Sequence, residues 1–308
     1  MRLIRALRSA LAGCAVLAMP GAAHAQFPNI GGLIKGAENV KKLGDSFRKI
    51  DEPEEIKIGG DLASIILGTA PLLQDRAKQH YVNRVGRWLA LHSDRPDLPW
   101  KFGIIDTSDV NAFSMPGGYV LITRGMLDRM RNESELAGVL AHEISHVVNK
   151  DHLKALQNSM RDSALGGFTD YIGGSGGLAG QFKTALINAG KDMFMRGLDK
   201  DDEYDADRMG VVIAARSGYS PYGLVGVLQT LSASPDDKGF ALMNKTHPLP
   251  VDRIERLDRA MGTKLDSVTD VVEDLPGFSQ MLMSTETATP SRQPAHAPAK
   301  RRRGYRRN

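Results

Sequence analysis

The feature that most constrains this chain is the pentapeptide His142-Glu143-Ile144-Ser145-His146, which lies in a run whose apolar positions recur at helical spacing. On a helix, two imidazoles four residues apart lie about 40° apart around the axis and about 6 Å apart along it. Two neutral imidazole nitrogens on one helix face can therefore bind a single Zn²⁺. Glu143 lies on a neighbouring face, where its carboxylate can hold a water beside the metal without binding the metal. The pentapeptide thus predicts a zinc site.

The helix that carries this motif has a clear predicted start. Asn132 can cap the first turn, and Glu135 follows at the third helical position, where its side chain can reach back to the cap. Residues 150–160 contain good helix formers and no glycine or proline. We therefore expect one continuous helix from Asn132 to about residue 160.

A catalytic zinc usually has three protein ligands and one open position, so a third ligand is needed. His152 lies ten residues after His142 and matches the spacing H-E-x-x-H-x-x-G-x-x-H, in which a glycine ends the helix. This chain has Asn149 at the glycine position, and Asn can also adopt a left-handed conformation. If the helix instead continues, His152 lies about 15 Å from His142 along the axis and cannot share its metal. We therefore expect His152 to be a surface histidine rather than a metal ligand.

The stronger candidate for the third ligand is Glu203, which opens the segment Glu203-Tyr204-Asp205-Ala206-Asp207 at the start of a helix predicted over 201–217. A glutamate from a separate helix would complete a site of two histidines and one glutamate. Asp207 lies one turn further on the same face and can accept the free ring N–H of a ligating histidine. Taken alone, these acids would only be an acidic first turn that suits the helix dipole. Beside the histidine pair, they predict a metal site.

Several motifs that occur in the same order resemble one gluzincin metalloprotease family. Its members include the heat-shock protease HtpX, the CAAX prenyl protease and periplasmic proteases of outer-membrane quality control. The similarity spans about residues 55–260 and rests on four segments: His142–His146, Glu203–Gly210, Thr246-His247-Pro248 with Arg253, and Asn111–Phe113 with Pro116–Gly118. Because the sequence predicts no transmembrane helix, it is most similar to the exported branch of the family.

The resemblance implies an α+β, mostly helical zincin domain, with a small antiparallel β-sheet and an active-site helix carrying the H-E-x-x-H motif. It implies one Zn²⁺ per chain, with Glu143 as general base and Asp207 behind the ligands. The implied ligands are His142, His146 and Glu203.

The resemblance also places His247 near the metal, where it would act as a reversible fourth ligand or as a donor to the transition state. The alternative is a structural histidine at a helix entry. Arg253 is expected to be structural or to position the substrate.

The implied function is a zinc-dependent metalloendopeptidase that cleaves misfolded or unassembled proteins in the bacterial cell envelope, in association with the outer membrane. The alternative is a periplasmic chaperone or assembly factor for outer-membrane proteins that uses zinc structurally or in a latent site. The intact Glu143 argues against this alternative, because a purely structural site has no need of that carboxylate.

Two segments, 101–106 and 118–123, read as strands, and a turn-rich segment containing Pro116 separates them. Proline in or beside a strand favours the edge of a sheet. An edge strand leaves backbone groups free to pair with an extended peptide, so this segment is a candidate for substrate docking. A simple hairpin is the alternative.

The chain divides into four predicted parts. Residues 1–25 have the basic start, apolar run and Ala-His-Ala end of a signal peptide, followed by an amphipathic segment over 26–54. The metalloprotease domain is expected over 55–283, and a disordered basic tail over 284–308. The expected location is the periplasm. A lipobox-like Leu-Ala-Gly-Cys that ends at Cys14 gives the alternative of a lipid anchor in the outer membrane.

The net charge of +4 comes from the two ends of the chain. Residues 1–25 hold three arginines and no acid, and residues 284–308 hold seven Lys or Arg and one Glu, so residues 26–283 are acidic. The basic charge therefore gives no indication of a nucleic-acid partner. A glycine-rich stretch over 166–180 has the composition of a mobile loop and is a candidate lid.

Overall fold

The computed structural model describes residues 50–166, 190, 194, 196–234, 237–265, 268, 271–274 and 276–283. The chain divides into two units, 1–43 and 44–308, and every described residue belongs to the second. The predicted signal peptide, nearly all of the candidate lid and the basic tail lie outside the described residues. Within the described residues, no helix is both long enough and apolar enough to cross a membrane.

Two helices precede the sheet: α2 (Glu52–Thr69) and α3 (Arg76–Leu91). Each begins at an aspartate whose side chain accepts a backbone N–H of the first turn. Asp51 accepts from Glu54 and Asp75 accepts from Lys78, both at 3.0 Å. Pro71 lies between the two helices, at the break that the sequence predicts.

The sheet contains three strands in the order β1-β3-β2: β1 (Lys101–Ile105), β2 (Ala112–Met115) and β3 (Tyr119–Thr123). The fold class is confirmed as mostly helical with a small sheet, but the sheet is mixed rather than antiparallel. Strands β2 and β3 form an antiparallel hairpin, and β1 pairs with the other side of β3 in parallel. The hairpin occupies one side of β3, so β1 pairs on the side that remains.

The two edges of this sheet differ in what covers them. The outer edge of β1 is covered by the connection between α2 and α3, where Leu73 N donates to Ile104 O and Asp106 N donates to Pro71 O, both at 2.8 Å. Strand β2 has no second strand partner among the described residues. The sequence predicts a turn-rich segment here, and the structure instead has a strand, β2, directly before Pro116 at the edge of the sheet.

Helix α5 (Glu133–Asn149) carries the H-E-x-x-H motif through the centre of the fold. Asn132 caps it by accepting from Glu135 N at 2.9 Å, as predicted, and the Glu135 carboxylate accepts from Arg131 N at 2.7 Å. Every residue from Glu133 to Val147 is buried.

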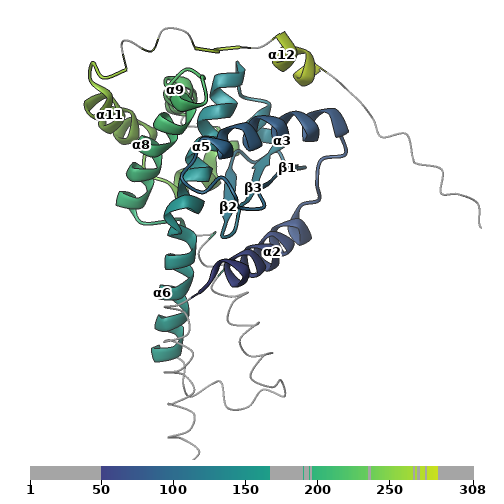
Figure 1. The fold of residues 1–308 in the computed structure, drawn as a ribbon, viewed down its shortest axis with the longest axis vertical. Coiled ribbons are helices and arrows are strands. Elements are labelled where there is room, and N and C mark those ends of the chain that lie inside the picture. Colours follow the sequence, from purple (N-terminus) through teal and green to yellow (C-terminus); the bar gives the residue numbers. More distant parts are fainter. Residues whose placement is uncertain are drawn as a thin grey trace, which may run out of the picture. The chain divides into compact units, whose positions relative to one another are not determined.

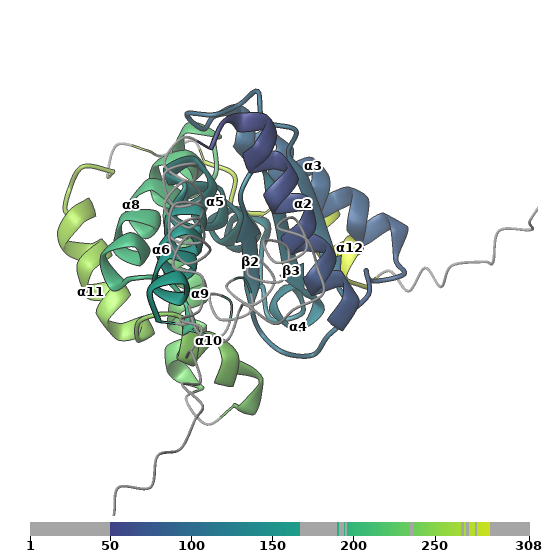
Figure 2. The ribbon, with the colours of Figure 1, turned by 90° about the horizontal axis from the view of Figure 1, so that it is seen from below.

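Figure 2 shows α5 between the sheet on one side and helices α8 and α11 on the other, with α3 on the far side of the sheet. The predicted helix over 201–217 is confirmed. The helices after the sheet are α4 (Arg124–Leu127), α6 (Asp151–Gly166), α8 (Lys200–Arg216), α9 (Gly223–Ala233), α10 (Ala241–Thr246), α11 (Pro250–Met261) and α12 (Pro276–Met283), with a 3₁₀ turn η2 (Lys238–Phe240) before α10.

The expected continuous helix from Asn132 to residue 160 is wrong. Helix α5 ends at Asn149, Lys150 has a left-handed conformation with φ of 61°, and α6 begins at Asp151 in a new direction (Figure 1). The sequence contains no breaker here, so the cause is tertiary. Lys150 Nζ lies 2.9 Å from the carboxylate of Glu55 on α2, which provides a buried partner for its charge.

Glu55 is fully buried and joins several parts of the fold. Its carboxylate accepts two hydrogen bonds from Arg95, at 2.7 and 3.1 Å, and one from Gly117 N at 3.1 Å. Arg95 also donates to Val147 O in the last turn of α5, at 3.3 Å. Glu55 thereby connects α2, the β2–β3 turn and the end of the motif helix.

Replacing Glu55 by alanine should destabilise the protein strongly, because it leaves the largely buried Arg95 with only the exposed carboxylate of Glu52 as counter-charge. We expect a loss of about 3 kcal/mol in the free energy of unfolding, measured by urea denaturation. Glu54→Ala is the control, because Glu54 is exposed on the same helix. Equal stability of the two variants would contradict this role of Glu55.

Candidate metal centre

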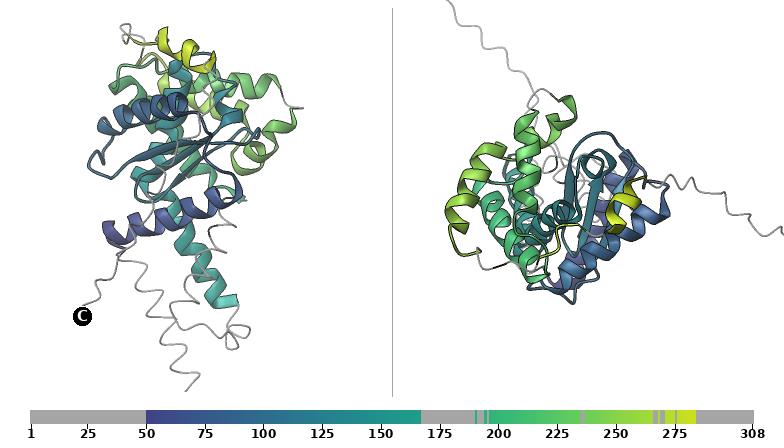
Figure 3. Two further views of the ribbon diagram at one scale, coloured as in Figure 1. Left: turned by 90° about the vertical axis from the view of Figure 1, so that its right-hand side faces the viewer. Right: turned by 90° about the horizontal axis from the view of Figure 1, so that it is seen from above.

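Helices α5 and α8 approach each other closely where the predicted ligands lie. Gly210 of α8 faces the backbone of α5, and a Cβ at this position would lie 3.0 Å from His142 N. This close approach lets α8 pack against α5, and Figure 3 shows the ribbon from two further sides. The predicted ligands from the two helices are therefore brought together.

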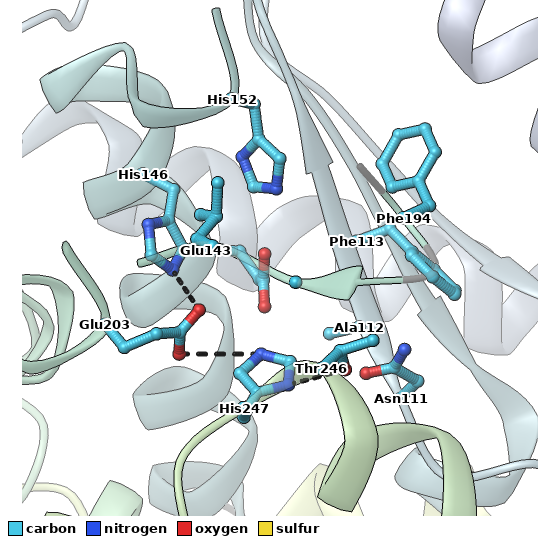
Figure 4. A pocket seen from close by; sticks show the side chains of 12 residues that line it. Asn111, Ala112, Phe113, Glu143, His146, His152, Phe194, Glu203, Thr246 and His247 are labelled. Carbon is cyan, nitrogen blue, oxygen red and sulfur yellow. Dashed lines mark hydrogen bonds and ion pairs between the residues drawn. The ribbon is translucent and has the colours of Figure 1, made fainter. Parts of the chain in front are cut away.

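The three predicted ligands converge on one point. The Nε2 atoms of His142 and His146 lie 3.2 Å apart, and each lies 3.6 Å from an oxygen of Glu203. Figure 4 shows the contact between His146 and Glu203. All three side chains are almost fully buried. Their ligand atoms form one of the two groups within the described residues that could hold a metal ion.

The outer nitrogen of each histidine contacts a buried carboxylate. His142 Nδ1 lies 2.9 Å from Asp207, and His146 Nδ1 lies 3.0 Å from Asp151. When each Nδ1 donates its proton to its carboxylate, the two Nε2 atoms face each other with lone pairs. Lone pairs at 3.2 Å repel unless a proton or a cation lies between them.

A second indication of a cation site is Glu203 Oε2, which is buried and has no hydrogen-bond partner. Buried carboxylate oxygens are normally satisfied, so an unpartnered one is a position where a ligand fits. Two imidazole nitrogens and one carboxylate match the donor set of a zinc site with one open position. The residues present therefore fit a divalent cation.

At Asp207 and His142, burial and the neighbouring charged groups shift the pKa in opposite directions. Burial alone raises the pKa of Asp207, but the charge and hydrogen bonds of Arg253 hold that pKa far below its ordinary value. Arg253 donates to both Asp207 oxygens, at 2.9 and 2.6 Å. Burial lowers the pKa of His142, but its contacts with Asp207 and Glu203 outweigh burial and raise it to about 9.

His247 also lies beside Glu203, with its Nε2 3.7 Å from Glu203 Oε2. Its Nδ1 lies 2.9 Å from the hydroxyl of Thr246, and that hydroxyl donates to Leu242 O. The hydroxyl can therefore accept from His247 Nδ1, which leaves Nε2 with a lone pair directed toward the site. Burial lowers the pKa of His247, which keeps this ring neutral.

Glu143 completes the second group that could hold a metal ion, with His142 and His247. Its side chain is 3% exposed and points into the pocket between the ligands and strand β2 (Figure 4). This is the position that the motif predicts for a carboxylate beside the metal.

The expectation that His152 is a surface histidine is wrong. The turn at Lys150 directs His152 into the pocket, where its ring lies 5.4 Å from that of His146. Its Nδ1 lies 3.4 Å from Ser114 Oγ, and burial holds its pKa well below the ordinary value. His152 belongs to neither group of potential metal ligands within the described residues.

Three residues take positions at the site for which the sequence has no clear signal. Asp151 reaches His146 only because the chain turns at Lys150. Lysine rarely adopts the left-handed conformation of this turn. His152 depends on the same turn. Asn111 lines the pocket, and its Oδ1 is buried without a hydrogen-bond partner. The motif Asn111–Phe113 marks the segment but does not show that this amide is unpartnered.

Comparison with known proteins agrees with this geometry. Residues 76–261 match Peptidase family M48. The chain is 29% identical over 215 residues to the beta-barrel assembly-enhancing protease of Escherichia coli K12, which covers 65% of the chain and 42% of that protein. It is 31% identical over 169 residues to metalloprotease YcaL of the same organism, covering 54% and 65%. It is 28% identical over 179 residues to the mitochondrial metalloendopeptidase OMA1 of Schizosaccharomyces pombe, covering 58% and 51%.

A small mixed sheet, an H-E-x-x-H helix and a glutamate from a second helix define a zincin-type metallopeptidase domain. The chain belongs to peptidase family M48. It spans less than half the length of the beta-barrel assembly-enhancing proteases that it matches.

The raised pKa of His142 predicts that metal binding depends on pH. Zinc binds neutral imidazole, so below about pH 9 each ion must displace a proton from His142. We expect the apparent zinc affinity to rise roughly tenfold per pH unit up to this value and then to level off. Titration calorimetry in buffers of different ionisation enthalpy measures the protons released. Asp207→Asn should move the transition to lower pH, and an affinity independent of pH in the wild type would contradict the prediction.

Arg253→Met should weaken metal binding, because Asp207 loses the two hydrogen bonds that hold its carboxylate in place against His142. Loss of such a supporting contact typically lowers metal affinity by about 10- to 100-fold, which a chelator competition assay can measure. The control is Arg259→Met on the same helix, where the arginine is exposed. Equal zinc affinity of the two variants would contradict the supporting role.

Proposed function

We propose that this protein is a zinc-dependent metalloendopeptidase of the bacterial cell envelope that cleaves misfolded or unassembled proteins. The observation that carries the proposal is the facing pair His142 and His146 with the unpartnered oxygen of Glu203, beside which Glu143 points into an accessible pocket. A purely structural zinc site would have no use for this carboxylate.

In this proposal, His142, His146 and Glu203 hold the zinc ion. When bound, zinc supplies Lewis acidity, which activates water and polarises the scissile carbonyl. Glu143 accepts the proton of the attacking water and then delivers it to the leaving amine. Asp207 and Asp151 hold the two imidazoles in the tautomer that directs Nε2 at the ion.

His247 is positioned to act on the same site from the substrate side. Because Thr246 can accept from its Nδ1, the lone pair on Nε2 favours a reversible fourth ligand over a hydrogen-bond donor. A peptide carbonyl would then replace His247 when substrate binds, which would make the resting protein less active.

The substrate backbone would lie along the outer edge of β2. No strand of the described residues pairs with this edge, which borders the pocket that contains Glu143. Asn111 precedes the strand, and its buried, unpartnered Oδ1 can accept an N–H from an extended peptide. A peptide bound in this way presents its carbonyl to the metal ligands.

The names of the bacterial relatives connect those proteins with β-barrel assembly, which supports envelope proteins as the substrates here. We propose that residues 1–25 are a signal peptide that directs export to the periplasm, with a lipid anchor at Cys14 as the alternative. The remaining parts would be an N-terminal segment over 26–54, the catalytic domain over 55–283 and a basic tail over 284–308.

Glu143→Gln should retain zinc and lose peptidase activity, because the amide cannot accept the proton of water. We expect the rate of casein cleavage to fall by at least about 100-fold, with zinc content unchanged by metal analysis. The control is Glu255→Gln, since Glu255 is exposed on α11, far along the chain from the motif. Cleavage by Glu143→Gln at the wild-type rate would contradict the mechanism.

A further inference from the structure

Three rings line one end of the pocket, and they come from three separate elements. Phe113 lies on the edge strand β2, His152 on the first turn of α6, and Phe194 just before α8. Figure 4 shows them across the pocket from Glu203, with Glu143 between. Each side chain is only partly buried, so each retains surface that the core does not cover.

The rings form a continuous series that starts at a metal ligand. His146 contacts His152 edge-on at 5.4 Å between centroids, and His152 contacts Phe194 at 6.2 Å. Phe194 contacts Phe113 edge-to-face at 5.9 Å. These separations lie in the range of favourable aromatic pairs, so the three rings support one another as a wall.

The backbone is held close to two of the three rings, Phe194 and His152. Gly197, three residues after Phe194, lies so close to Thr246 that a Cβ there would be 1.8 Å from the Thr246 carbonyl oxygen. His152 is held by the turn at Lys150 and by its contact with Ser114. Binding against this wall therefore requires little reorganisation of the backbone.

The chemistry of the two pocket ends differs. Among the described lining residues, the carboxylates are Glu143 and Glu203, and both belong to the metal side. No charged side chain joins the rings at the other end. Ligand pockets typically combine an apolar wall with a few polar groups that fix orientation, and this pocket has that division.

We propose that Phe113, His152 and Phe194 form a subsite that accepts a large apolar or aromatic side chain next to the scissile bond. This inference rests on the proposed peptidase function and specifies the substrate class. A peptide on the β2 edge with its carbonyl at the metal ligands would place an adjacent side chain against the rings. Such side chains are buried in folded proteins and exposed in misfolded ones, so the subsite would select unfolded chains.

The first test maps cleavage sites in reduced casein by mass spectrometry, using the full zinc-loaded chain. We expect Phe, Tyr, Leu and Met to be enriched at one position beside the scissile bond, by about tenfold over Ala. Phe113→Ala and Phe194→Ala should each remove most of this preference. Phe194→Leu retains apolar packing and should reduce the preference for Phe over Leu in the substrate. This variant tests the subsite if Phe194→Ala does not fold.

The second test measures binding without hydrolysis. Phenylalanine hydroxamate should bind the zinc-loaded protein at least about tenfold more tightly than alanine hydroxamate, and both Phe variants should lose the difference. The matched control is Tyr222→Ala, because Tyr222 is a half-exposed aromatic residue that does not line the pocket.

The outcomes separate the two proposals. Cleavage without enrichment, equal binding of the two hydroxamates, or failure of both to bind the zinc-loaded protein would overturn the subsite. A preference for phenylalanine hydroxamate together with no cleavage of casein would overturn the peptidase function and leave the subsite supported.

Discussion

The site depends on one buried carboxylate that forms no ion pair with a lysine or arginine of the described residues. Asp151, Glu203 and Asp207 are each 1% exposed. Arg253 neutralises Asp207, and Lys154 lies 3.2 Å from Asp151, but the ion-pair partners of Glu203 among the described residues are imidazoles. Burying a carboxylate without a counter-charge is costly, so either protons on the histidines or a metal ion must balance it. The raised pKa of His142 reflects this need.

The surrounding fold can be understood as support for that charge arrangement. Helix α8 supplies both Glu203 and Asp207, and Gly210 lets it approach α5 closely enough for them to reach the histidines. Helix α11 supplies Arg253 at a buried position, behind Asp207. Helices α8 and α11 therefore bring the predicted ligands together and also supply the charged groups that shift their pKa values.

The turn at Lys150 connects the rest of the fold to the site. It directs Asp151 toward His146 and His152 into the pocket, and it is held by the buried carboxylate of Glu55, nearly 100 residues earlier in the chain. Glu55 lies outside residues 76–261, the part that matches the family. The N-terminal helix α2 thus contributes to the geometry of the metal centre without contacting it.

The sequence by itself determined the features that depend on local spacing. Spacing and residue type predict the helix that carries the H-E-x-x-H motif and its Asn132 cap, and the structure shows both. The roles of His142, His146 and Glu203 as metal ligands stay predictions, and the structure brings their ligand atoms together. Only the tertiary structure decided the parallel pairing of β1, the end of α5 at Asn149 and the inward position of His152. Local propensity favoured a continuous helix through Lys150. A left-handed turn at this residue becomes stable only when a distant, buried carboxylate compensates it, and no local pattern in the sequence reports such a contact.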